Sequence, residues 1–67
     1  MIHKTAIVDK NAKVDSSVSV GPFSVIGPNV EIAENVIIYS HVNIVGNTRI
    51  GSGNKFYPFA SIGNDPQ

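Results

Sequence analysis

Hydrophobic residues recur along this chain with a period of six. Every sixth position from the second residue onward is apolar, and nearly all of these residues are β-branched. The series is Ile2, Val8, Val14, Val20, Ile26, Ile32, Ile38, Ile44, Ile50, Phe56 and Ile62. On an α-helix a step of six rotates a side chain by about 600°, which scatters the series over different faces. On an extended chain six is even, so all members face one side. The period therefore excludes an amphipathic helix and predicts short β-strands.

A second column of smaller residues lies two positions before the first. Its members are Ala6, Ala12, Val18, Ser24, Val30, Val36, Val42, Thr48, Asn54 and Ala60. Since two residues separate the columns, both face the same side of an extended chain. We expect a core built from one large and one small apolar column.

Turn residues separate the pairs of core positions. They include Lys10-Asn11, Pro28-Asn29, Glu34-Asn35, Gly46-Asn47 and Ser52-Gly53. Asn or Gly in the second place is expected to supply the positive φ of a type II turn, and Pro in the first place presets φ to about −65°. Each group of six residues is thus predicted to be a short strand followed by a corner.

Three such strands can close into a triangular coil, because a strand this short cannot bury its apolar face alone. Coils of eighteen residues then stack with parallel strands ~4.8 Å apart. The predicted fold is all-β, a parallel β-helix, with residues 1–67 forming a single segment of between three and four coils.

The eighteen-residue register sorts the corners into three columns. Two columns carry ordinary turn residues: Asn11, Asn29, Asn47 and Asp65 in one, Ser17, Asn35 and Gly53 in the other. The third reads Thr5, Phe23, His41 and Phe59, with His3, Gly21, Tyr39 and Tyr57 beside it on the outward face. A contiguous apolar patch on one edge predicts a partner. We therefore expect an interface within a threefold assembly, formed by Phe23, Tyr39, His41, Tyr57 and Phe59; alternatively, these rings stack along the coil without any neighbour.

Composition limits the remaining possibilities. Lys plus Arg equals Asp plus Glu at five each, and the charges are scattered, which predicts no nucleic-acid partner. There is no Cys, and His3 and His41 alone cannot form a zinc cluster, so neither a disulfide nor a metal or other cofactor is expected.

No apolar stretch reaches the ~20 residues that span a bilayer, so we expect a cytoplasmic protein. A core this small stabilises a fold by only ~3–5 kcal/mol, which predicts support from oligomerisation or a longer chain.

Several stretches are more specific than the repeat. These are Gly21-Pro22-Phe23, the run from Ile26 to Ile32, Ser40-His41-Val42, the run from Gly46 to Gly51 with Asn54, and the run from Tyr57 to Gly63. In these stretches the chain resembles the N-terminal part of the bacterial UDP-N-acetylglucosamine O-acyltransferases that begin lipid A synthesis. The resemblance implies a left-handed coil and a homotrimer. It also implies transfer of a 3-hydroxyacyl chain from acyl carrier protein to the 3-hydroxyl of UDP-N-acetylglucosamine.

The same resemblance says which functional residues this chain holds. The general-base histidine of the family lies several coils further on, so no catalytic residue is assigned here, and the chain is expected to be truncated relative to the family and inactive alone. A Gln-Asp pair that contacts substrate follows the Ser-Ile-Gly stretch in the family. Gln67 matches its first member and is the one substrate-binding candidate.

Two other classes of function compete with this interpretation. A γ-class carbonic anhydrase has the same coil but needs three histidines on zinc, and only two occur here, in different columns. A purely structural or oligomerisation module remains open. His3 and His41 are better explained as surface and packing residues, and the scattered carboxylates as a solvated surface, than as acid–base groups.

Overall fold

The computed structural model describes residues 1–63, and this part of the chain contains short β-strands and no helix. The strands are β1 (Ile7–Val8), β2 (Lys13–Val14), β3 (Ser19–Val20), β4 (Val25–Ile26), β5 (Val30–Ile32), β6 (Ile37–Ile38), β7 (Asn43–Ile44), β8 (Thr48–Ile50), β9 (Lys55–Phe56) and β10 (Ser61–Ile62). No helix within residues 1–63 is long and apolar enough to cross a membrane. The prediction of an all-β chain is confirmed.

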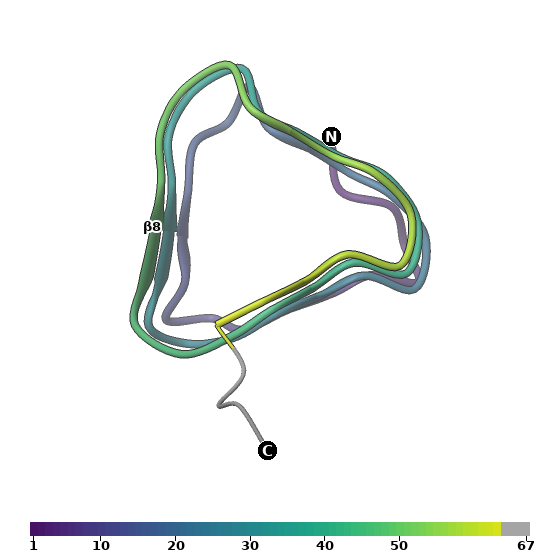
Figure 1. Ribbon diagram of the computed structural model, residues 1–67, viewed down its shortest axis with the longest axis horizontal. Helices are drawn as coiled ribbons and strands as arrows, with labels where there is room; N and C mark the ends of the chain where they lie inside the picture. Colours follow the sequence, from purple (N-terminus) through teal and green to yellow (C-terminus); the bar gives the residue numbers. More distant parts are fainter. Residues whose placement is uncertain (64–67) are drawn as a thin grey trace.

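The strands form three parallel sheets that enclose a triangle (Figure 1). One sheet has the order β1-β4-β7-β10, the second β2-β5-β8 and the third β3-β6-β9. Residues eighteen apart are paired, as in Ile26 with Ile44 and Val20 with Ile38. The predicted parallel β-helix with an eighteen-residue coil is therefore confirmed.

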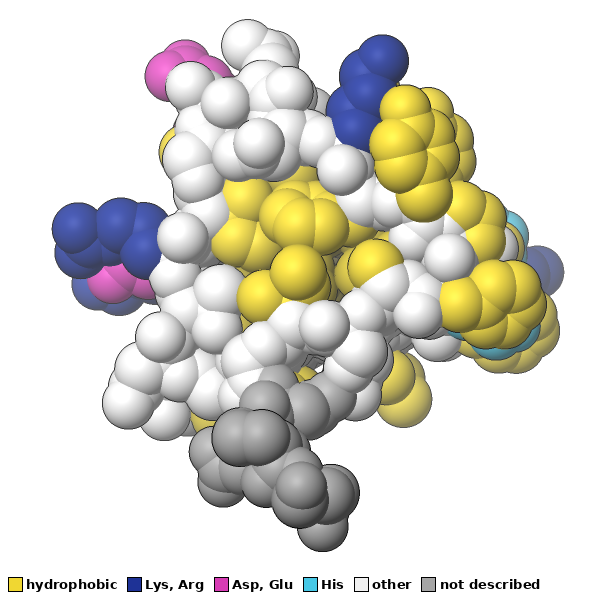
Figure 2. All heavy atoms as spheres, viewed as in Figure 1, with side chains coloured by type: hydrophobic (Ala, Val, Ile, Leu, Met, Phe, Trp, Pro, Cys, Tyr) yellow, Lys and Arg dark blue, Asp and Glu magenta, His cyan; other side chains and the backbone are white. Residues whose placement is uncertain are grey.

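The interior of the triangle is filled by the two predicted columns. Its ten buried apolar residues are Val18, Val20, Ile26, Val30, Ile32, Val36, Ile38, Val42, Ile44 and Ile50. Ser24 from the small column is buried with them. Figure 2 shows hydrophobic side chains in the middle of the triangle, seen along the coil. Burial of this apolar surface is the main force that holds the coils together.

At the two ends of the coil the predicted core is less complete. Ile2 is 47% exposed although it pairs with Val20 on β3, and Asn54 is exposed instead of joining the small column. Val8, Phe56 and Ile62 are only partly buried. The prediction fails at Ile2 and Asn54 because, within the described residues, these positions have a neighbouring coil on one side only.

The corners follow the turn prediction only in part. Asn35 and Gly53 have the expected positive φ, of 58° and 75°. Asn11, Asn29 and Asn47 do not, so the type II prediction is wrong for that corner. In the first coil the turn closes instead by a hydrogen bond from the Ala12 amide to the Asp9 carbonyl, at 3.0 Å. In that turn neither central residue has a positive φ, and such a turn accepts most side chains, whereas at Gly46-Asn47 the positive φ of 76° falls on the glycine in the first place.

Candidate functional site: an aromatic edge

The aromatic edge consists of Phe23, Tyr39, His41, Tyr57 and Phe59, which the sequence predicted to lie together. They occupy the corners that lead from β3, β6 and β9 into β4, β7 and β10. Because each coil takes eighteen residues, these corners stack directly above one another. The structure thus brings all five side chains to one edge of the triangle.

Two ladders of rings run along the aromatic edge. In the first, His41 lies between Phe23 and Phe59, with ring centroids 5.2 and 5.0 Å away. In the second, Tyr39 and Tyr57 stack almost parallel, with centroids 5.3 Å apart and an interplanar angle of 8°. These distances are in the favourable range for aromatic pairs. The predicted contact of the rings along the coil is therefore confirmed, whereas the interface stays a prediction.

The position that precedes the tyrosine ladder at this corner has no room for a side chain. Gly21 stands one coil before Tyr39, and a Cβ on Gly21 would lie 2.7 Å from the carbonyl carbon and oxygen of Tyr39. A side chain there would displace the corner that carries the tyrosine ladder. Gly21 therefore lets the second and third coils approach closely at this edge.

The backbone of the first ladder is unusual. Phe23, His41 and Phe59 have φ values of 60°, 57° and 69°, in the left-handed region. Bulky side chains are uncommon in that region because Cβ approaches the backbone carbonyl. At the neighbouring corner Asn35 and Gly53 have the same left-handed conformation, which they tolerate better than an aromatic residue does. The aromatic edge thus places large side chains where a turn favours small ones.

A buried serine holds the backbone on both sides of His41. The Ser24 hydroxyl donates a hydrogen bond to the Tyr39 carbonyl at 2.8 Å and accepts one from the Val42 amide at 3.1 Å. Ser24 is fully buried, so these bonds satisfy a hydroxyl that would otherwise be costly inside the core. The sequence pattern placed Ser24 in the small column but did not predict this function; the signal was a hydroxyl in an otherwise apolar series.

Exposed apolar side chains are confined to the aromatic edge and its surroundings. The exposed large hydrophobic residues of the described part are Met1, Ile2, Ile7, Phe23, Val25, Tyr39, Tyr57 and Phe59. Each belongs to the edge, to sheet β1-β4-β7-β10, or to the segment that pairs with β3. None lies on β2-β5-β8. Figure 2 shows hydrophobic side chains and histidine gathered at the right-hand corner, with Lys or Arg side chains beside them, and a further group of charged side chains on the left.

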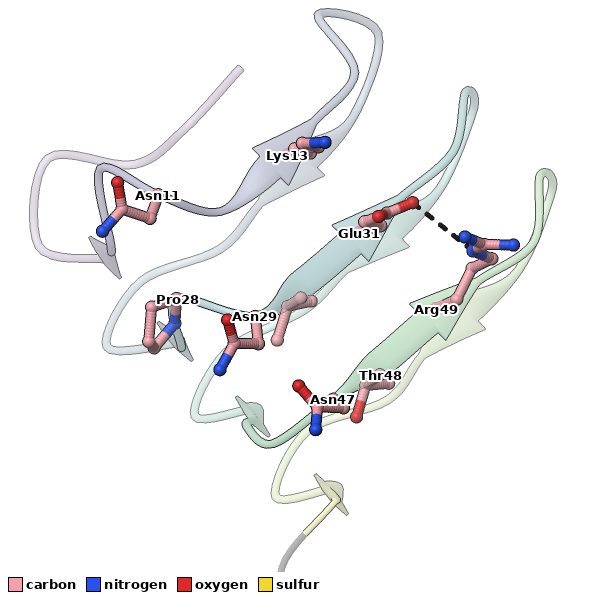
Figure 3. A pocket seen from close by; sticks show the side chains of 9 residues that line it. Asn11, Lys13, Pro28, Asn29, Glu31, Asn47, Thr48 and Arg49 are labelled. Atoms are coloured by element: carbon pink, nitrogen blue, oxygen red, sulfur yellow. Dashed lines mark ion pairs between the residues drawn. The ribbon is translucent and has the colours of Figure 1, made fainter.

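The third sheet, β2-β5-β8, carries a row of charges. Its outward residues Lys13, Glu31 and Arg49 are in register, and Arg49 Nε lies 3.4 Å from Glu31 Oε2. The row itself and the adjoining corner, which holds Asn29, line a groove of about 540 Å³ (Figure 3). Exposed ion pairs of this kind contribute little to stability. This side of the coil has the character of a solvated surface.

The remaining polar candidates do not converge. The His3 ring nitrogen Nδ1 lies 2.8 Å from the Thr5 hydroxyl, and this hydroxyl accepts a hydrogen bond from the Phe23 amide. Two hydrogen bonds from Ser17 lower the pKa of the Asp15 carboxyl, and the bond from the Ser17 hydroxyl has the larger effect, ahead of the bond from its backbone amide. Within residues 1–63 no three His, Cys, Asp or Glu side chains lie close enough to hold a metal ion. Gln67 lies outside the described residues.

Comparisons with known proteins place this coil among the transferases. Residues 11–46 match the model of the bacterial transferase hexapeptide family, a domain of six repeats. A search of curated protein sequences gives no match. Two solved structures are similar over nearly the whole chain. The Francisella novicida UDP-N-acetylglucosamine acyltransferase shares 50% identity over 98% of the chain, with a TM-score of 0.95. LpxA from Acinetobacter baumannii shares 46% identity over 91% of the chain, with a TM-score of 0.88.

In both structures the match covers 24% of the relative, so this chain spans about a quarter of its length. A mirror-image coil could not superpose at a TM-score of 0.95. The coil therefore has the same hand as these enzymes, in agreement with the left-handed coil that the resemblance implied.

Proposed function

The chain belongs to the bacterial transferase hexapeptide family, and we propose that it forms the opening coils of an acyltransferase acting on UDP-N-acetylglucosamine. The proposed reaction moves a 3-hydroxyacyl chain from acyl carrier protein to the sugar 3-hydroxyl, the first step of lipid A synthesis. The observation that carries the proposal is 50% identity over 98% of the chain. The hexapeptide repeat by itself requires only the inward columns and some corners, so identity of this extent goes beyond what the coil alone needs.

In the proposed enzyme this segment is scaffold, and the chain alone has no acyl transfer activity. Activating a sugar hydroxyl against a thioester needs a general base, usually held in place by a third group. His41 is the nearest candidate on the edge, but its ring lies between the rings of Phe23 and Phe59. In the part of the chain that the structure describes, the His41 ring donates no hydrogen bond to a carboxylate that would orient it. This geometry favours a packing function, with the base on a later coil.

We also propose that the enzyme is a cytoplasmic homotrimer whose subunits meet at the aromatic edge. The exposed large hydrophobic residues lie on this edge, on the sheet β1-β4-β7-β10 that follows it and on the N-terminal segment beside β3, while the sheet β2-β5-β8 carries a row of charges. A twofold contact uses one self-complementary patch. In a cyclic assembly each subunit touches two neighbours, and an apolar edge turned toward the axis contacts both of them.

A chimera tests the acyltransferase proposal. The coils of the Francisella novicida enzyme that match this chain are replaced by residues 1–63, and acyl transfer to UDP-N-acetylglucosamine is measured. A matched control carries the same length of coil from a hexapeptide protein of another activity. We expect the first chimera to retain most of the kcat/KM of the parent and the control to lose it. Two equally active chimeras would mean that any hexapeptide coil suffices, which favours the structural-module alternative.

A further inference from the structure

The three corners of the first coil, residues 1–18, share one construction. At each corner the backbone carbonyl of the leading residue accepts a hydrogen bond from the amide three positions later, at 2.9–3.0 Å. The side chain of the same residue accepts a second bond, from the amide two positions later, at 2.9–3.2 Å. The leading residues are His3, Asp9 and Asp15. A side-chain acceptor at the start of a turn is a known alternative to a backbone acceptor.

Later corners satisfy the equivalent amide in a different way. The amide of His41 donates to the Pro22 carbonyl at 3.0 Å, and that of Gly53 donates to the Glu34 carbonyl at 3.1 Å, so the preceding coil supplies the acceptor. In the part of the chain that the structure describes, no coil precedes residues 1–18. The leading side chains of the first coil therefore take the place of a coil, much as the first side chain of an α-helix takes the place of a missing turn.

The sequence of the later corners agrees with this difference. Their leading positions within residues 1–63 carry no carboxylate and no imidazole. These positions are Gly21, Gly27, Ala33, Tyr39, Val45, Gly51, Tyr57 and Gly63. Side-chain acceptors at the leading position are thus confined to the coil that needs them.

At the Asp15 corner the hydrogen bonds continue into the second coil. The Ser17 hydroxyl donates to Asp15 Oδ2 at 2.6 Å and accepts a hydrogen bond from the Asn35 amide at 2.8 Å. The Ser17 hydroxyl, followed by the Ser17 amide, also lowers the pKa of Asp15, because both bonds favour the ionised carboxylate. This corner therefore links the first coil to the second through an ionised side chain.

The His3 corner has the same arrangement, with an imidazole in place of the carboxylate. The Thr5 hydroxyl accepts a hydrogen bond from the Phe23 amide at 3.1 Å and lies 2.8 Å from His3 Nδ1. The Thr5 amide donates to the same nitrogen at 3.2 Å. Because an amide can only donate, Nδ1 carries no proton and accepts a bond from the hydroxyl as well. His3 is therefore neutral at this corner, with its proton on Nε2.

We infer that His3, Asp9 and Asp15 form an end cap that holds the first coil on the second, and that acid weakens this end cap. All three side chains act as acceptors; protonation weakens a carboxylate as an acceptor and removes the lone pair of Nδ1. The first coil covers one end of the core, since its strands β1 and β2 pair with the strands that hold Ile26 and Ile32. Loosening the end cap would expose these buried side chains. The inference does not depend on the acyltransferase proposal.

Few charges surround the end cap. The second coil carries Gly21, Gly27 and Ala33 in the same three columns, and none of these residues titrates. The charged side chains beside it, in the chain or around the groove that Asp15 lines, are Lys4, Lys10, Lys13, Glu31 and Arg49. Within residues 1–63 no ion pair includes a residue of the end cap, so hydrogen bonds hold it.

Alanine and asparagine separate the acceptor from its titration. The triple variant His3→Ala, Asp9→Ala, Asp15→Ala removes all three acceptors, whereas His3→Asn, Asp9→Asn, Asp15→Asn keeps an acceptor that favours the same turn and does not titrate. Ala33→Asn is the matched control. It adds an acceptor at the leading position of a later corner, whose amide is already hydrogen-bonded to the first coil.

Thermal unfolding by circular dichroism, from neutral to acid pH, measures stability, and amide hydrogen exchange by NMR locates the change. At neutral pH we expect the asparagine variant and the control to melt like the wild type. The alanine variant should melt at least about 4 °C lower, with faster exchange confined to residues 1–18. As the pH falls, the wild type should lose stability faster than the asparagine variant. The reason is that ionised Asp15 stabilises the fold above the ordinary aspartate pKa, and this contribution is lost as the pH falls through the lowered pKa.

Three results would overturn the inference. An alanine variant that melts and exchanges like the wild type would show that the acceptors do not hold the first coil. An asparagine variant as unstable as the alanine variant at neutral pH would show the same. Equal pH dependence in the wild type and the asparagine variant would exclude weakening by acid. If the triple alanine variant does not fold, Asp9→Ala replaces it and should melt below Asp9→Asn; equal melting temperatures would count against the end cap.

Discussion

Shortening Ile44 should destabilise the coil more than any equal change at its ends. Ile44 is fully buried, and its strand β7 pairs with β4 below and β10 above, so that Ile26 and Ile62 are its neighbours in the column. Replacing a buried isoleucine by alanine costs about 2–5 kcal/mol, because the surrounding coils cannot collapse into the space. A core of this size supplies only about 3–5 kcal/mol in total. We therefore expect Ile44→Ala to be largely unfolded at room temperature.

A milder change makes the effect measurable. Ile44→Val removes one methylene and should cost about 0.5–1.5 kcal/mol, which lowers the melting temperature by roughly 4–8 °C per kcal/mol in a domain of this size. The matched control is Ile62→Val, since Ile62 is only partly buried at the open end of the same column. Its melting temperature should fall by less than half as much.

Thermal unfolding followed by circular dichroism provides the comparison. All three chains are measured at one protein concentration, because association would add to the apparent stability. Equal losses for Ile44→Val and Ile62→Val would refute a core that is complete in the middle and open at the ends. An unchanged melting temperature for Ile44→Val would refute the packing of the column itself.

Four further outcomes follow from the same structure. Ile32→Asp buries a charge without a partner and should leave the chain unfolded by circular dichroism. The 67-residue chain alone should give no acyl transfer above a no-protein control, since a general base usually contributes ~10²–10⁴ in rate. Changing Phe23 and Phe59 together to serine should shift the sedimenting species from trimer to monomer, whereas loss of a ladder alone would lower only the melting temperature. The folded state lowers the pKa of Asp15, so ionised Asp15 stabilises the fold at a pH above the ordinary aspartate pKa. This contribution to the free energy of unfolding is lost as the pH falls through the lowered pKa, and Asp15→Asn should therefore make stability less dependent on pH in the acid range.

The period of six was sufficient to predict the fold and most of the core. Inward positions are determined by alternation along an extended chain, and alternation is visible in the sequence. Burial at the ends was not predictable in this way, because it depends on whether another coil lies on both sides of Ile2 and Asn54. The gathering of the aromatic edge followed from the eighteen-residue register alone.

The corners were less predictable than the strands. Asn and Gly favour the left-handed conformation without requiring it. Asn35 adopts that conformation, whereas Asn47 does not. The left-handed aromatic residues could not be predicted, because intrinsic preference disfavours them and the stacked coil overrides it. Nor did the residue pattern reveal that Ser24 bridges two coils, since its two partners are backbone groups at Tyr39 and Val42.

One turn of the coil takes eighteen residues, and both the aromatic edge and the match to the transferases depend on this periodicity. Proton–proton contacts measured by NMR test it directly. We predict contacts between the rings of Tyr39 and Tyr57, whose centroids are 5.3 Å apart, and from His41 to both Phe23 and Phe59. Contacts of these rings with residues six or twelve positions away in the sequence, and none with residues eighteen positions away, would contradict the eighteen-residue coil.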